Sequence, residues 1–238
     1  MSTAPDATNL FDALRDAILR GMAHALSNRV AALGGVSMLA DPGQIWTERL
    51  SKALQDEARR LEEILRLMRL LPNDGRGEPG AVELQPLIPD VAALHAYNSA
   101  LLQVECATVH DRETMPVYAN RPQLVHALLL AIDTAKRHAL ARGARVVVSY
   151  AGDTERVAIR VVTEPSATAR PANGGGDSNT AQTAAMEAAL PSAIARVGGS
   201  FPAAISSNDG ALRIEISVPT LAAGRRSERS TSAARPVG

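Results

Sequence analysis

The sequence contains few aromatic residues, one cysteine and no excess of either charge. Aromatic residues make up 3% of the 238 residues and hydrophobic residues 46%, so we expect a core of Ala, Leu, Val and Ile. Cys106 is the single cysteine, which excludes an intramolecular disulfide and a cysteine-based zinc site. Lys plus Arg and Asp plus Glu both number 25, so the charge balance does not indicate a nucleic-acid partner.

Long apolar runs and a secretory signal are also lacking. No uninterrupted apolar run approaches the roughly 20 residues that are needed to span a bilayer. The beginning of the chain is polar and contains Asp6, Asp12 and Asp16, which does not resemble a signal peptide. We therefore expect a cytoplasmic protein without a membrane partner.

The first part of the chain has two long helical patterns. Apolar residues recur at helical spacing from Leu10 to Leu39 and again from Gln44 to Leu71, and the turn signal Asp41-Pro42-Gly43 separates them. This arrangement predicts an antiparallel hairpin, in a domain over residues 1–72. A lone hairpin leaves apolar stripes uncovered, so we expect a homodimer in which two hairpins form a four-helix bundle.

The second part of the chain predicts an α/β sandwich over residues 81–220, so that the whole chain is of the α+β class. A linker rich in Gly and Pro over 72–80 precedes it. The expected helices are 82–94, Pro122–Ala141 and 184–197, and the expected strands are 101–109, 145–150, 156–162, 201–206 and 212–218. Pro122 near the first helical position and Gly143 after the last one favour a helix between them. Residues 221–238 have little apolar content and are expected to form a disordered tail.

The candidate site is the string His24-Ala-Leu-Ser-Asn28 within the first helix. His24 and Asn28 are four residues apart and therefore lie beside each other on one helix face. An imidazole offers a nitrogen nucleophile near neutral pH, so it can receive a phosphoryl group and pass it on. The helical wheel places His24 on the flank of the apolar stripe, where a globular partner can reach it.

A hairpin that carries His-x-x-x-Asn, followed by such a sandwich, resembles the core of sensor histidine kinases over residues 10–219. The family's ATP-binding motifs are absent here. Its paired asparagines correspond to Leu130 and Thr134, and its adenine-binding Asp-x-Gly corresponds to the neighbourhood of Glu164 and Pro165. The nearest glycine cluster, 174–176, is followed by Asp177, which would repel phosphate.

The hairpin differs from the kinases as well. Ala25 occupies the position where kinases usually place an acid that acts as a base during attack on ATP, and Arg29 the position after Asn28 where they often place a proline. An aspartyl phosphate is a more reactive donor and makes less demand on such a base. The pattern therefore resembles histidine phosphotransferases of the ChpT type, which keep the kinase shape without binding ATP, although that subfamily also commonly retains the acid.

The resemblance implies a phosphotransferase that shuttles phosphoryl groups between receiver-domain aspartates. His24 is the expected phosphoacceptor, and Asn28 and Ser27 are expected to support it. Arg20, Gly21 and Ala25 are expected to line the docking surface for a receiver. The chain would need no cofactor or metal of its own, because the receiver would supply Mg²⁺.

Two other functions stay open: a divergent ATP-dependent histidine kinase, and a non-catalytic dimeric scaffold that docks response regulators. The other histidines show no spacing typical of metal ligands and are expected to be structural or exposed. These residues are His95, His110, His126 and His138. The identity of the receivers and the direction of phosphate flow are not encoded in any motif of the chain.

Overall fold

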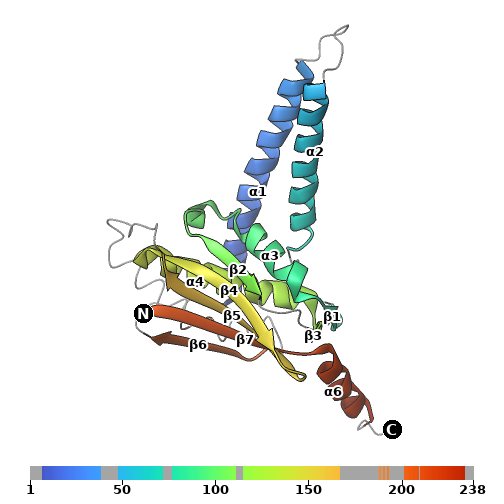
Figure 1. Cartoon of the computed structure of the whole chain (residues 1–238), viewed down its shortest axis with the longest axis vertical. Coiled ribbons are helices and arrows are strands. Elements are labelled where there is room, and N and C mark those ends of the chain that lie inside the picture. Colours follow the sequence, from blue (N-terminus) through green and yellow to red (C-terminus); the bar gives the residue numbers. More distant parts are fainter. Residues whose placement is uncertain are drawn as a thin grey trace.

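In the computed structural model, two long helices form a hairpin that projects from a mixed α/β body (Figure 1). Helix α1 spans Ala7–Met38 and helix α2 spans Glu48–Met68, so both predicted helices are present. The predicted turn at Asp41-Pro42-Gly43 lies outside the described part of the chain. The structure describes residues 7–38, 48–71, 77–110, 115–166, 188, 190, 192, 201–208 and 210–233.

The body is built on a five-stranded sheet with the order β2-β4-β5-β7-β6. Strand β2 is parallel to β4, and every other neighbouring pair is antiparallel, so the sheet is largely antiparallel. The bounds are Cys106–His110 for β2, Ala144–Gly152 for β4, Arg156–Pro165 for β5, Ala203–Asn208 for β6 and Ala211–Pro219 for β7. The helices that cover one face of this sheet are α3, Leu84–His95, and α4, Arg121–Arg142 (Figure 1). The α+β class predicted from the sequence is confirmed.

Helix α4 is the centre of the body. Its N-cap is Asn120, whose side chain accepts a hydrogen bond of 3.1 Å from the backbone N–H of Gln123. Its C-terminal end is Gly143, which has a left-handed φ of 63°. Every residue from Leu124 to Lys136 is buried. The helix predicted from Pro122 and Gly143 is therefore confirmed, and its burial on all sides reflects packing between the sheet and the other helices.

The beginning of α1 belongs to the same core as the body. Phe11, Leu14, Ile18 and Met22 recur every three or four residues, and each is less than 9% exposed. The ring of Phe11 packs against the ring of His126 on α4, tilted by 39°. One hydrophobic cluster therefore joins the first four turns of α1 to the sandwich, while the rest of α1 continues outward beside α2 (Figure 1).

Three features of the body differ from the sequence prediction. The strand expected over 101–109 is divided into a short 3₁₀ helix, η1, Ser99–Leu101, and strand β2, which begins only at Cys106. A two-stranded sheet of β1, Gly80–Val82, and β3, Val117–Ala119, was not expected, because strands of three residues have no readable periodicity. Most of the helix expected over 184–197 lies outside the described residues.

The prediction of a disordered tail over 221–238 is wrong for its first part. Residues Leu221–Ala233 form helix α6. The helix begins where the backbone N–H of Leu221 donates to the carbonyl of Pro116 at 2.8 Å, and Gly224 then lies against the side chain of Tyr118. The first turn of α6 thus docks on β3, and this tertiary contact, which composition does not reveal, supports the helix. Among the described residues, no helix combines the length and apolar character required to cross a membrane.

Candidate functional site

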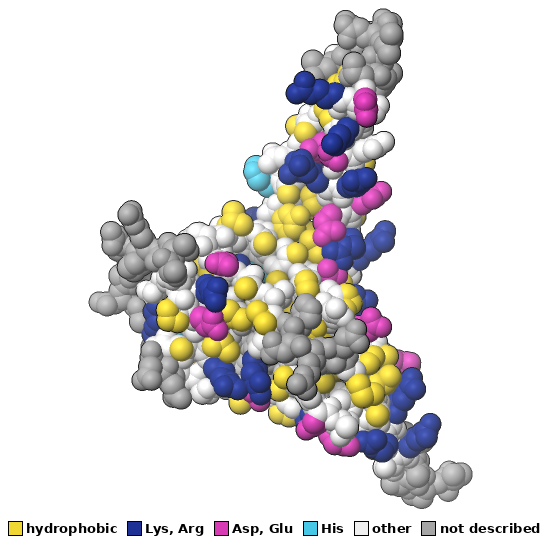
Figure 2. All heavy atoms as spheres, in the orientation of Figure 1, with side chains coloured by type: hydrophobic (Ala, Val, Ile, Leu, Met, Phe, Trp, Pro, Cys, Tyr) yellow, Lys and Arg dark blue, Asp and Glu magenta, His cyan; other side chains and the backbone are white. Residues whose placement is uncertain are grey.

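His24 lies on the exposed flank of α1, four turns beyond the start of the helix and outside the core of the body. Its Nε2 atom is 3.3 Å from the side-chain nitrogen of Asn28, one turn further along. The Asn28 amide can donate to Nε2 in the tautomer that carries the ring proton on Nδ1. The histidine visible on the flank of the hairpin in Figure 2 is the only one that the two helices contain. The structure thus brings together the two residues that the spacing paired.

Ser27 is exposed but turns to its own backbone. Its hydroxyl donates a hydrogen bond of 2.9 Å to the carbonyl of Ala23, four residues earlier. Its oxygen keeps acceptor capacity only, so the hydroxyl can donate to a ligand only after that bond is broken. A supporting role of Ser27 in phosphotransfer stays a prediction.

The three residues predicted to meet a docking partner have different environments. Arg20 is exposed on α1, as docking requires. Gly21 lies against the chain itself, because a Cβ atom added there would be 1.8 Å from the carbonyl oxygen of Tyr97. Ala25 is half-buried and packs against the core. Gly21 and Ala25 are both half-buried, because α1 passes close to the end of α3. A docking role for Arg20, Gly21 and Ala25 stays a prediction.

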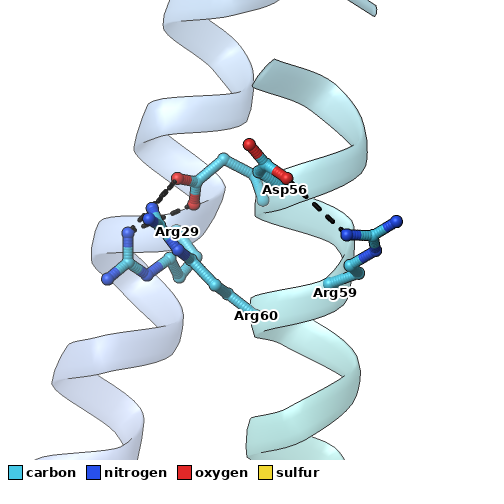
Figure 3. Close-up of polar contacts among 5 residues, drawn as sticks. Arg29, Asp56, Arg59 and Arg60 are labelled. Carbon is cyan, nitrogen blue, oxygen red and sulfur yellow. Dashed lines mark hydrogen bonds and ion pairs between the residues drawn. The ribbon is translucent and has the colours of Figure 1, made fainter. Parts of the chain in front are cut away.

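A cross-helix ion cluster lies beside the candidate site and was not expected from the sequence. Glu57 on α2 is 9% exposed, and both its carboxylate oxygens are 3.3 Å from Nη1 of Arg29 on α1. Arg60, one turn further on α2, donates to the same carboxylate at 2.6 Å (Figure 3). Arg29 directly follows Asn28, so the cluster fixes α1 against α2 next to the His24 and Asn28 pair. The Glu57 to Arg60 spacing was readable from the sequence, whereas the partner across the hairpin was not.

The α4 positions that match the kinase magnesium site are closed. Leu130 and Thr134 are 2% and 1% exposed, and the Thr134 hydroxyl donates to the Leu130 carbonyl at 2.9 Å. Neither residue presents an oxygen to a metal ion at the surface. Glu164 is paired with Arg145 at 3.0 Å. The glycine cluster at 174–176 lies outside the described residues, and within those residues no group of three potential His, Cys, Asp or Glu metal ligands occurs.

A buried polar network joins α3 to α4. Asp133 on α4 lies 3.1 Å from Nε2 of His95, accepts a hydrogen bond of 3.1 Å from Asn98 and pairs with Arg137 at 2.7 Å. Burial lowers the pKa of His95, whereas its hydrogen bond to Asp133 opposes that shift. The expectation of structural histidines is confirmed for His95, for His126 and for His138, which are 0%, 8% and 1% exposed.

Comparison with known proteins found solved structures of similar fold but no related sequence. No protein family and no curated protein matched the sequence. The catalytic domain of the histidine kinase ThkA matches at 13% identity with a TM-score of 0.45, over 60% of this chain and 97% of that domain. A histidine kinase from Burkholderia phymatum matches at 14% identity with a TM-score of 0.44, over 88% and 97% of the two chains. A bacterial phosphotransferase matches at 14% identity with a TM-score of 0.39, over 85% and 95%. The chain is similar to these proteins in fold, and we base its function on its own residues.

Proposed function

We propose that this protein is a histidine phosphotransferase of a two-component phosphorelay, which carries phosphoryl groups between receiver-domain aspartates on His24 without using ATP. The observation that carries the proposal is the exposed imidazole of His24 with the Asn28 side chain 3.3 Å from Nε2. The neighbouring surface supports it, because Ala23, Ser27 and Ala31 are exposed and small. Their side chains leave room for a globular partner to bring an aspartyl phosphate to the ring.

The proposed reaction is an in-line displacement at phosphorus. The lone pair of Nε2 attacks the phosphorus of the acyl phosphate, the N–P bond forms, and the bond from phosphorus to the carboxyl oxygen breaks. The receiver carboxylate leaves with that electron pair, and the Nδ1 proton is then released to solvent. Transfer to the aspartate of a second receiver reverses the same steps.

The chain's own residues position the ring in this reaction. The Asn28 side chain orients the imidazole of His24, and the Arg29–Glu57–Arg60 cluster keeps α1 in register with α2 beside it. Ala25 supplies no base, which an acyl phosphate requires less than ATP does. The receiver would supply Mg²⁺, in keeping with the buried Leu130 and Thr134.

We further propose that the protein acts as a homodimer whose hairpins form a four-helix bundle. On α2, Leu54, Ala58, Leu61, Leu65 and Met68 are spaced alternately by four and three residues, which is the pattern of a helix–helix seam. Leu65 is 49% exposed, and Val30 on α1 is 61% exposed. A second hairpin would cover these side chains while leaving His24 on a different face of α1.

The proposal is tested by phosphoryl transfer from a receiver domain that carries ³²P on its aspartate. The wild-type chain should acquire acid-labile label, and His24→Ala should acquire none. Asp16→Asn, an exposed substitution two turns earlier on the same helix, is the matched control and should be labelled as the wild type is. Equal labelling of wild type and His24→Ala would overturn the proposal.

The same experiment separates the alternatives. Labelling of His24 from γ-³²P-ATP without any receiver would identify an ATP-dependent kinase. Receiver binding that is unchanged in His24→Ala, with no phosphohistidine formed on the wild-type chain, would identify a scaffold.

A further inference from the structure

Lys136 is a buried lysine whose amino group has no hydrogen bond or ion pair to any described residue. It is one of only two lysines in the chain, in which arginine supplies nearly all the positive charge. Its residue is 3% exposed, in the middle of α4. Within the described part of the chain, no hydrogen bond or ion pair of its ammonium group occurs, whereas the other lysine, Lys52 on α2, is exposed to solvent. An ammonium group in such a position keeps little of its hydration and has no bonded counter-charge to offset the loss.

The nearest acid on the helix does not compensate this charge. Asp133, one turn before Lys136, is already engaged by His95, by Asn98 and by Arg137. Burial lowers the pKa of Lys136, and the nearby Cys106 and Asp133 only partly oppose that shift. Lysine, unlike arginine, can lose its proton when it is buried, so the site accommodates both the neutral amine and a paired ammonium.

Lys136 lines a cavity of about 360 Å³ between α3 and the edge strand β2. The wall on α3 is apolar and consists mainly of Ala92, Ala93 and Ala96. The opposite wall carries Cys106 and Thr108, which alternate along β2 and therefore point to the same face of the sheet. A cavity with apolar walls and a few convergent polar groups is typical of small-molecule sites, and this volume lies at the lower end of their range.

We propose that this cavity binds a small carboxylic acid with a short aliphatic chain. The carboxylate would pair with the ammonium group of Lys136, and the aliphatic chain would lie against the alanine wall of α3. Glu105 also lines the cavity, but its side chain is exposed to solvent, where water and salt screen its charge. The site is separate from His24, and the inference does not depend on phosphotransfer.

The two lysines make a direct test possible. In protein labelled with ¹³C at lysine Cε, Lys136 and Lys52 give two side-chain signals, and Lys52 serves as the internal control. Millimolar hexanoate should shift the Lys136 signal, raise the pH at which it titrates, and leave the Lys52 signal unchanged. Titration calorimetry should show that Lys136→Met weakens hexanoate binding by about tenfold or more, as expected for loss of a charged partner. Lys52→Met should bind hexanoate as the wild type does.

Two further probes separate charge recognition from apolar binding. Hexanol has the chain without the charge, and acetate has the charge without the chain, so both should bind more weakly than hexanoate. Hexanol binding as tightly as hexanoate would overturn the role of Lys136, and acetate binding as tightly would overturn that of the alanine wall. No shift of the Lys136 signal with hexanoate would overturn the whole inference.

Discussion

The contact between Gly21 and Tyr97 predicts opposite effects of the same substitution at two positions of α1. At Gly21, an added Cβ atom would be 1.8 Å from the Tyr97 carbonyl oxygen and 2.9 Å from the carbonyl carbon. At Gly35, near the end of the helix, an added Cβ would meet nothing within 4 Å. Gly35→Ala is therefore a matched control for Gly21→Ala, because both replace an interior glycine of one helix.

The expected free energies follow from two terms. Alanine favours a helix over glycine by about 1 kcal/mol, and this term is present at both positions. At position 21 the methyl group must displace backbone atoms of the last turn before η1, and such overpacking costs about 1–3 kcal/mol. The neighbour is backbone and not a flexible side chain, so the upper part of this range applies. We expect Gly35→Ala to raise the free energy of unfolding by up to about 1 kcal/mol and Gly21→Ala to lower it by about 1–2 kcal/mol.

The measurement is urea unfolding of both variants and the wild type, followed by far-UV circular dichroism. The same proteins are then used for phosphoryl transfer from a labelled receiver. Because Gly21 lies one turn before His24, displacement of α1 should slow labelling of Gly21→Ala, whereas Gly35→Ala should be labelled at the wild-type rate. Equal stability of the two alanine variants would refute the close packing of α1 on the end of α3.

Three further predictions concern other parts of the molecule. Burial lowers the pKa of His126 from 6.5 to about 4. The free energy of unfolding should therefore be highest above pH 6.5 and fall by about 3 kcal/mol as the pH drops toward 4. In His126→Leu, urea unfolding should show that this pH-dependent decrease is lost. Leu65→Glu should convert the proposed dimer to a monomer in light scattering, whereas Ala81→Glu, at an exposed position of β1, should not. Asn28→Ala should leave His24 able to accept phosphate but slow its labelling about tenfold, in rapid-quench measurements; unchanged rates would remove Asn28 from the mechanism.

The sequence predicted those parts of the fold that depend on local signals. The helix from Pro122 to Ala141 was recognisable because Pro122 is a strong start signal and Gly143, just beyond its end, a strong stop signal. The pairing of His24 with Asn28 follows from helical geometry alone. Contacts between distant segments have no such local signal. The contact of Gly21 with Tyr97 and the docking of α6 on Tyr118 each depend on one element packing beside another, so neither could be read from composition.

Charged residues show the same limit at the candidate site. In the sequence, Arg29 is notable only for the proline that it replaces, and nothing around Glu57 indicates that it is buried. The structure places the Glu57 carboxylate between two helices, with Arg29 and Arg60 as its partners. The pairing joins residues 28 positions apart, and no periodicity within one helix can reveal it.

The continuous core between α1 and α4 bears on what the sandwich contributes. Leu14, Ile18 and Met22 are buried in the same cluster as the α4 side chains, and Phe11 packs on His126. Separating α1 from the sandwich would expose these four apolar side chains, at about 1.5–3 kcal/mol for each large one. A hairpin that swings freely on the body is therefore disfavoured. If His24 is the phosphoacceptor, the sandwich acts as a fixed support for the helix that carries it, and a receiver would meet one preformed surface.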